Sequence, residues 1–97
     1  MKYSLHPEAQ SDLREAAGFY REHADNVLAL FFLGEFERAV DMLLRHPALG
    51  ALWRNGKRRY GMQRFPYSLI YTTAGEEIRI LAVAHYSRRP GYWRDRK

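Results

Sequence analysis

The spacing of hydrophobic and polar residues changes partway along this chain, from the period of a helix to that of a strand. Residues 2–5 alternate between polar and apolar side chains, as a short edge strand does. Apolar residues then recur at helical spacing through residues 7–45, which predicts amphipathic helices. From residue 58 onward they stand in short runs rich in β-branched and aromatic side chains, which predicts strands. This order predicts an α+β fold: an N-terminal strand, a helical hairpin and a three-stranded antiparallel meander in one sheet.

Two helices are expected because a helix-breaking segment interrupts the helical pattern. The first helix begins at Pro7, where proline's missing N–H has no cost, and ends near Ala24. Asp25 then offers its carboxylate as an N-cap for a second helix over residues 27–45, which ends before Pro47. So short a connection joins the two helices as an antiparallel hairpin.

The second helix carries more apolar side chains than one buried stripe requires. These side chains are Leu28, Leu30, Phe31, Phe32, Leu33, Phe36, Val40, Leu43 and Leu44. A helix with so wide an apolar surface needs more than one partner. The interpretation that we favour places it between the first helix and the sheet. The alternative is that part of this surface contacts another subunit or protein.

Three antiparallel strands are expected in the second half of the chain, after a loop over residues 48–56. The strand-forming runs cover residues 58–65, 67–73 and 77–84. A tight turn with Gly75 joins the last two runs into a hairpin. The last run is small or β-branched on both of its faces apart from Arg79, so it should be a central strand that is covered on both sides.

Side chains suited to chemistry follow directly after this central strand. They are His85, Tyr86, Arg88, Arg89, Tyr92 and Trp93. A rigid strand would deliver a proton-transfer group, two guanidiniums and three aromatic rings to one end of the sheet. We therefore expect the functional site there. The alternative is that His85 bonds to a neighbouring carbonyl and that the aromatic residues pack the tail onto the sheet.

The charge of the chain is distributed unevenly between its two halves. Residues 1–50 contain 5 of the 16 Lys and Arg residues and 8 of the 11 Asp and Glu residues. Residues 51–97 therefore hold 11 basic and 3 acidic side chains. Such a basic half suits a polyanion or an acidic partner, although arginines can also simply solvate a sheet.

Length and composition narrow the class of protein further. The 97 residues suit a single domain over residues 1–97. The absence of cysteine excludes disulfides and thiolate chemistry and fits a cytoplasmic protein. No apolar run approaches the roughly 20 residues that span a membrane. The four histidines lie on different expected elements without a linking carboxylate pattern, so we expect no metal and no cofactor.

Several short motifs are spread over nearly the whole chain. They are His6-Pro7-Glu8-Ala9, Tyr20, His46-Pro47, Phe65-Pro66-Tyr67-Ser68-Leu69-Ile70-Tyr71, Ile80-Leu81-Ala82-Val83-Ala84-His85 and Arg89-Pro90-Gly91-Tyr92-Trp93. Together they resemble the RelE/ParE superfamily of toxins from type II toxin-antitoxin systems. The resemblance implies a small α+β fold and a cognate antitoxin. It also implies either cleavage of messenger RNA on the ribosome, as by RelE-like members, or poisoning of DNA gyrase, as by ParE-like members.

Metal-free RNA cleavage needs a base for the 2′-hydroxyl, cations at the phosphate and an acid for the leaving oxygen. The residues that we predict to be catalytic are His85, Tyr92 and Arg64. The residues that we predict to bind phosphate or RNA are Arg58, Arg88, Arg89 and Tyr86. His85 and Tyr92 stand near the positions at which the related nucleases place catalytic side chains, as the resemblance implies.

One position departs from the nucleases that the chain resembles. Those nucleases carry an arginine where this chain has Ser68, and loss of the guanidinium removes a phosphate contact unless Arg64 or Arg58 replaces it. The first interpretation is a toxin that acts as a metal-free, ribosome-dependent mRNA endonuclease, with ribosome and mRNA as partners. The alternatives are a non-enzymatic gyrase inhibitor and an inactive relative that only binds the antitoxin.

Overall fold

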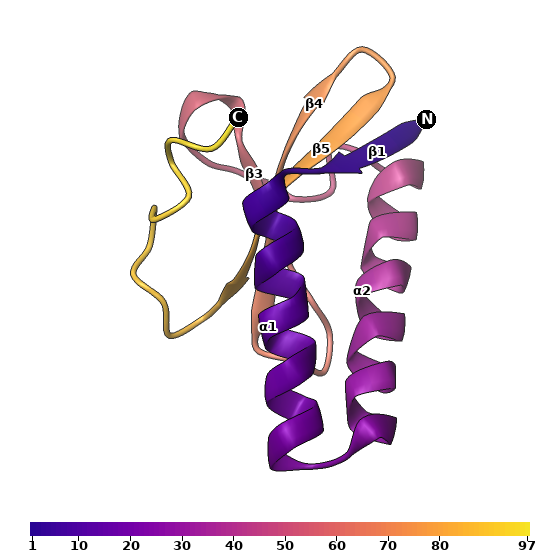
Figure 1. Ribbon diagram of the computed structural model, residues 1–97. Coiled ribbons are helices and arrows are strands. Elements are labelled where there is room, and N and C mark those ends of the chain that lie inside the picture. The colour runs from indigo at the N-terminus through magenta and orange to yellow at the C-terminus, as the bar shows by residue number, and fades with distance from the viewer.

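Two helices lie side by side against a five-stranded sheet in the computed structural model, which describes residues 1–97 (Figure 1). The elements are β1 (Lys2–Leu5), α1 (Pro7–His23), α2 (Asn26–Arg45), β2 (Ala51–Leu52), the single 3-10 turn η1 (Arg54–Gly56), β3 (Arg58–Gly61), β4 (Tyr67–Ala74) and β5 (Glu77–His85). The predicted α+β class and order of elements are confirmed. The sheet gains one strand over the prediction because residues 51–52, assigned to a loop, pair with β3.

The strands lie in the order β1-β5-β4-β3-β2. β1 runs parallel to β5, whereas the other neighbouring strands are antiparallel. β5 therefore has a strand on each side, as its apolar faces predicted. β3 ends at Gly61 and not at Phe65. The reason is that Arg64 takes a left-handed conformation with φ 72°, which turns the chain out of the sheet.

Local side-chain caps fix where the helices begin. Nδ1 of His6 accepts a hydrogen bond from the backbone N–H of Glu8 at 3.0 Å, at the start of α1. Oδ1 of Asp25 accepts one from the N–H of Leu28 at 2.8 Å, at the start of α2. Each cap satisfies a backbone donor that the first helical turn leaves free. The predicted helical hairpin is confirmed.

Apolar cores cover both faces of the sheet. Phe32 and Leu43 of α2 and Tyr71 of β4 belong to the main core of 16 buried residues between the helices and the sheet. On the opposite face, Trp93 packs in a smaller core with β4 and β5 residues. The segment after β5 is therefore part of the folded structure, and it lies beside the sheet on the side away from α2 (Figure 1).

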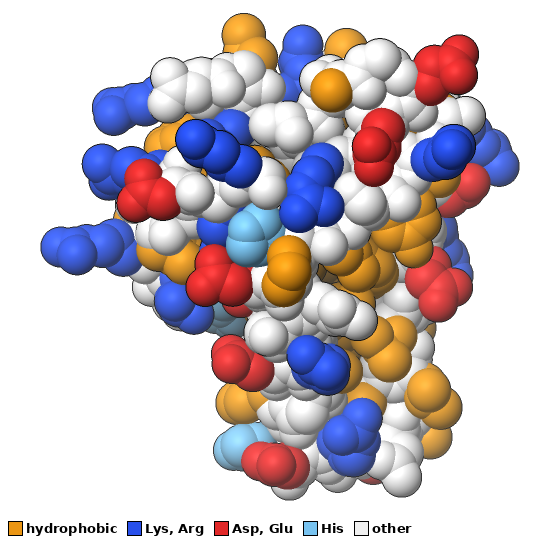
Figure 2. All heavy atoms as spheres, turned by 45° about the horizontal axis from the view of Figure 1, so that its top comes forward, with side chains coloured by type: hydrophobic (Ala, Val, Ile, Leu, Met, Phe, Trp, Pro, Cys, Tyr) orange, Lys and Arg blue, Asp and Glu red, His pale blue; other side chains and the backbone are white.

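The outer side of α2 keeps much of the apolar surface that its sequence predicted. The inner side packs against α1 and the sheet, as the favoured interpretation proposed. Val27 and Leu30 nevertheless remain 73% and 68% exposed. Apolar side chains come to the surface on the α2 side in Figure 2, whereas Lys and Arg side chains project on the side of the C-terminal segment. Neither helix is long and apolar enough to cross a membrane.

Candidate functional site

His85 lies at the end of β5, between two hollows that open on different sides of the sheet. Pairing of β4 with β5 sets His85 opposite Tyr67, and the two rings meet edge to face with centroids 4.9 Å apart. A hollow of about 320 Å³ lies between α1 and the end of β5. A smaller hollow of about 40 Å³ lies on the other side. His85 and Arg88 line both hollows, so the strand does deliver these two groups to one place.

The two hollows differ in charge. Asp12 and Glu15 of α1 line the larger one together with Arg88, so acidic and basic groups share its walls. The smaller one is lined by Arg59 and Arg88 and contains no carboxylate side chain. An anion therefore suits the smaller hollow better. No three His, Asp or Glu side chains gather closely enough in the chain to hold a metal ion.

Ser87 fixes the hydrogen-bonding role of the His85 ring. The backbone N–H of Ser87 donates to His85 Nδ1 at 3.0 Å, and the Ser87 hydroxyl lies 2.8 Å from the same nitrogen. A backbone N–H can only donate, so Nδ1 carries the lone pair and the uncharged ring holds its proton on Nε2. In this arrangement His85 offers a hydrogen-bond donor to a ligand and keeps its acceptor nitrogen occupied.

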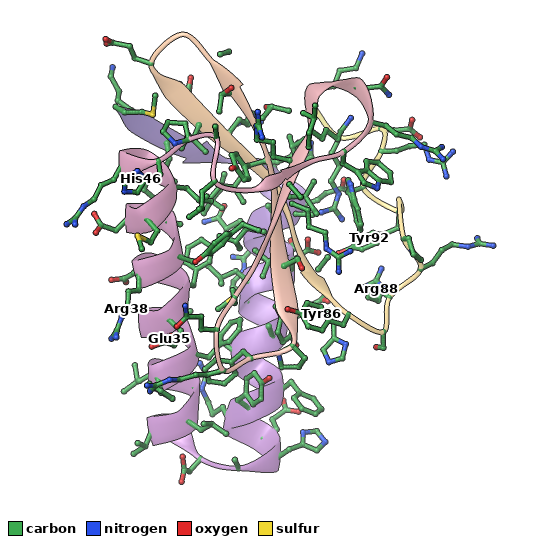
Figure 3. All side chains as sticks on the ribbon, turned by 180° about the vertical axis from the view of Figure 1, so that it is seen from behind. Glu35, Arg38, His46, Tyr86, Arg88 and Tyr92 are labelled. Atoms are coloured by element: carbon green, nitrogen blue, oxygen red, sulfur yellow. The ribbon has the colours of Figure 1, made fainter.

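Tyr92 is enclosed by guanidinium groups. Arg88 Cζ lies 4.1 Å and Arg96 Cζ 5.1 Å from the centroid of its ring. Figure 3 shows Arg88 and Tyr92 on the C-terminal segment, on the far side of the molecule from the outer face of α2. Burial and then the negative charge of Asp12 raise the pKa of Tyr92, against the opposite effect of the two arginines. The phenol therefore stays protonated at neutral pH, and its ring already has cationic partners.

The structure does not bring Arg58 and Arg64 to His85. Arg58 Nη1 donates to the backbone carbonyls of Gly50 at 2.8 Å and Ala48 at 3.3 Å, so this guanidinium holds the loop that follows α2. Arg64 lies over a phenylalanine ring of α2, with Cζ 5.8 Å from its centroid. Neither arginine lines the hollows beside His85.

Tyr86 and Arg89 follow His85 in the chain and are both exposed, but only Tyr86 lines a hollow. Tyr86 is exposed and lines the smaller hollow, where Arg59 Cζ lies 5.7 Å from its ring centroid. Arg89 is exposed and lines neither hollow. Of the residues predicted from sequence, His85, Arg88 and Tyr86 therefore share a hollow.

Arg59 is the site residue that the sequence reasoning missed. Its Nε donates to Ser68 Oγ at 3.0 Å, so Arg59, and not Arg64 or Arg58, brings a guanidinium to the Ser68 position. The antiparallel register pairs Gly61 with Ser68 and Arg59 with Ile70, which sets Arg59 diagonally across from Ser68 on the same face. Pairing the two strands from their turn outward, and taking alternate residues on one face, would have placed Arg59 beside Ser68.

The raised pKa of Tyr67 predicts that the folded chain loses stability at high pH. Burial, followed by the charges of Tyr20 and Tyr92, raises the pKa of Tyr67 from 10.0 to about 12. Because this pKa is higher in the folded chain, the stabilisation is fully present below about pH 10 and is lost as the pH rises towards 12. Urea unfolding at about pH 9 and about pH 11.5 should show a fall in the free energy of unfolding. Tyr67→Phe should reduce that fall, and an identical fall in both proteins would contradict the assignment.

Comparison with known proteins identifies a matching family and a solved structure with a similar fold. A sequence model described as the ParE toxin of the type II toxin-antitoxin system, parDE, matches residues 3–90. A solved structure titled "Chromosomal ParDE TA system from P. aeruginosa" is similar, with a TM-score of 0.77 and 24% sequence identity over 88% of this chain and 95% of that chain. At this identity the likeness concerns the fold. No sequence among the curated proteins matches the chain.

Proposed function

The chain belongs to the ParE toxin family of type II toxin-antitoxin systems, and from this premise we propose that it inhibits DNA gyrase by binding to it. An inhibitor of this kind needs a complementary protein surface and no group that transfers a proton to or from RNA. The exposed apolar side of α2 and the basic C-terminal side both offer such surface. An antitoxin is the partner that the family implies.

The arrangement of His85 is the observation that carries the proposal. A general base for RNA cleavage must present a free lone pair to the 2′-hydroxyl. Nδ1 of His85 accepts from Ser87, and Nε2 then carries the proton. The other groups predicted for catalysis also have contacts elsewhere, since Tyr92 contacts two guanidiniums and the Arg64 guanidinium lies over the Phe31 ring of α2. These contacts favour a binding surface over a metal-free nuclease.

One observation favours the ribosome-dependent endonuclease as the second candidate. Arg59 at Ser68 and Arg88 beside His85 line the same small basic hollow, which would suit a phosphate. In this alternative the Nε2–H of His85 donates a hydrogen bond to the phosphate or to the leaving oxygen. The two candidates therefore differ in whether toxicity depends on the imidazole.

Induction of the toxin without antitoxin separates the candidates. We expect growth arrest with broken DNA held in complexes with gyrase. Messenger RNA in the ribosomal A site should remain uncut. His85→Ala should arrest growth about as strongly as the wild type, because gyrase inhibition needs no proton transfer. His23→Ala, on the exposed end of α1, is the matched control.

The endonuclease predicts the opposite outcome for the same variants. Loss of a general acid or base lowers a rate by about 100-fold or more. If His85→Ala abolishes toxicity while it still binds antitoxin, and if the wild type cuts mRNA in the A site, the proposal of gyrase inhibition is wrong.

A further inference from the structure

A second basic hollow lies on the outer face of the sheet, apart from the site at the end of β5. It has a volume of about 440 Å³ and lies between η1, the middle of β4 and β5, and the end of the chain. Its walls include Lys57, Arg94, Arg96 and Lys97, with Leu81 as the one hydrophobic residue and no carboxylate side chain. So polar and cationic a lining suits an anion.

Lys57 lines this hollow with a side chain that is mostly covered and an ammonium that is open to solvent. It is only 7% exposed, yet its ammonium forms no hydrogen bond and no ion pair within the chain. The methylene stem of a lysine can be covered while its charged end stays in water, and an ammonium held in this way is available to an anion. The backbone holds it there, since the Lys57 carbonyl accepts from Trp53 N–H at 2.6 Å and its N–H donates to the Arg54 carbonyl at 3.2 Å.

The other cations of the hollow differ in how much of their charge is neutralised. Two carboxylates neutralise the charge of Arg96, because Asp12 Oδ2 lies 2.7 Å from its Nη1 and Glu8 Oε2 lies 3.2 Å from its Nε. Arg94 and Lys97 are exposed and have no carboxylate partner. Three positive charges, on Lys57, Arg94 and Lys97, therefore face the hollow without a counter-ion from a side chain.

We propose that this hollow binds a phosphate group, with Lys57, whose stem is held in the wall, as its anchor and with the exposed Arg94 and Lys97 beside it. Its volume lies in the range of about 300–1,000 Å³ that is common for ligand sites, so more than a single small ion can enter. Phosphate oxygens accept several charge-assisted hydrogen bonds at once, which matches three converging cations. The group belongs either to a free phosphate compound or to the backbone of a nucleic acid. This site does not depend on the proposed inhibition of gyrase, because an isolated chain suffices to test it.

Calorimetric titration of the purified full chain tests the proposal. The probes are inorganic pyrophosphate and an eight-nucleotide oligothymidylate, each at about 0.15 M salt to screen non-specific attraction. The chain has three lysines, Lys2, Lys57 and Lys97, so Lys2→Gln removes the same charge from β1, at a residue that does not line the hollow. We expect saturable binding that Lys57→Gln weakens by about tenfold or more and that Lys2→Gln changes by less than about twofold.

The two probes identify the source of the phosphate. Lys57-dependent binding of pyrophosphate points to a free phosphate compound, and Lys57-dependent binding of the oligonucleotide alone points to a nucleic-acid backbone. Arg94→Gln, an exposed substitution that should leave the fold intact, must also weaken the binding. Equal effects of Lys57→Gln and Lys2→Gln, or no saturable binding of either probe, would overturn the proposal.

Discussion

Replacing Asp12 by alanine should lower the free energy of unfolding by about 3 kcal/mol, the lower end of the range for breaking a buried ion pair. Asp12 Oδ2 accepts from Arg96 Nη1 at 2.7 Å and from the backbone N–H of Val83 at 3.1 Å. The Asp12 and Arg96 side chains are only 10% and 11% exposed. Removal of the Asp12 carboxylate leaves the Arg96 guanidinium and the Val83 N–H without this acceptor. The neighbouring Glu8, 3.2 Å from Arg96, limits the loss.

An exposed ion pair provides the control for the Asp12 prediction. Asp41 and Arg45 of α2 are 3.0 Å apart, but their side chains are 57% and 69% exposed. Asp41→Ala should therefore cost only about 0–1 kcal/mol. Urea unfolding of both variants at neutral pH gives the comparison. Equal losses would mean that the contact between Asp12 and Arg96 does not hold the C-terminal segment to α1.

Trp93→Ala should cost about 3–5 kcal/mol, the usual range for removing a buried tryptophan side chain. Trp93 packs against Ile70, Ala82 and Ala84 on the outer face of the sheet, and its ring centroid lies 5.6 Å from that of Trp53. It is the main apolar anchor of the segment after β5. Its loss should therefore also speed proteolysis within residues 86–97 before the rest of the chain is cut.

Trp93→Phe separates packing from hydrogen bonding at this position. The indole Nε1 of Trp93 is buried without a hydrogen-bond partner, so phenylalanine removes an unsatisfied donor while it keeps an aromatic ring. We expect a loss of less than about 1.5 kcal/mol, in the range for a tolerated hydrophobic exchange. If phenylalanine is as harmful as alanine, then the packing argument for Trp93 is wrong.

The helices and the central strand could be predicted because short-range signals determine them. Asp25 caps the second helix directly, and Pro7 stands inside the first turn of α1. The apolar faces of β5 predicted a covered strand, and cores on both sides of the sheet include its residues. Such signals act over a few residues, so the sequence alone contains them.

The grouping of the site residues could be predicted only in part. His85, Tyr86 and Arg88 stand at or just after the end of one strand and line the same hollow. The positions of Arg58 and Arg64 depend on contacts with other segments, namely the carbonyls of the loop after α2 and the Phe31 ring of α2. Arg59 reaches Ser68 through the pairing register of two strands, which spacing along one segment does not reveal. The two-residue strand β2 was missed because it is too short to show a period.

Supercoiling by purified DNA gyrase, measured with increasing amounts of the toxin, tests the proposed mode of action most directly. We predict that the wild type and His85→Ala inhibit supercoiling at similar concentrations and that neither cuts messenger RNA in a translating extract. Unchanged supercoiling together with cleavage of ribosome-bound mRNA by the wild type alone would contradict inhibition by binding and would assign His85 to catalysis.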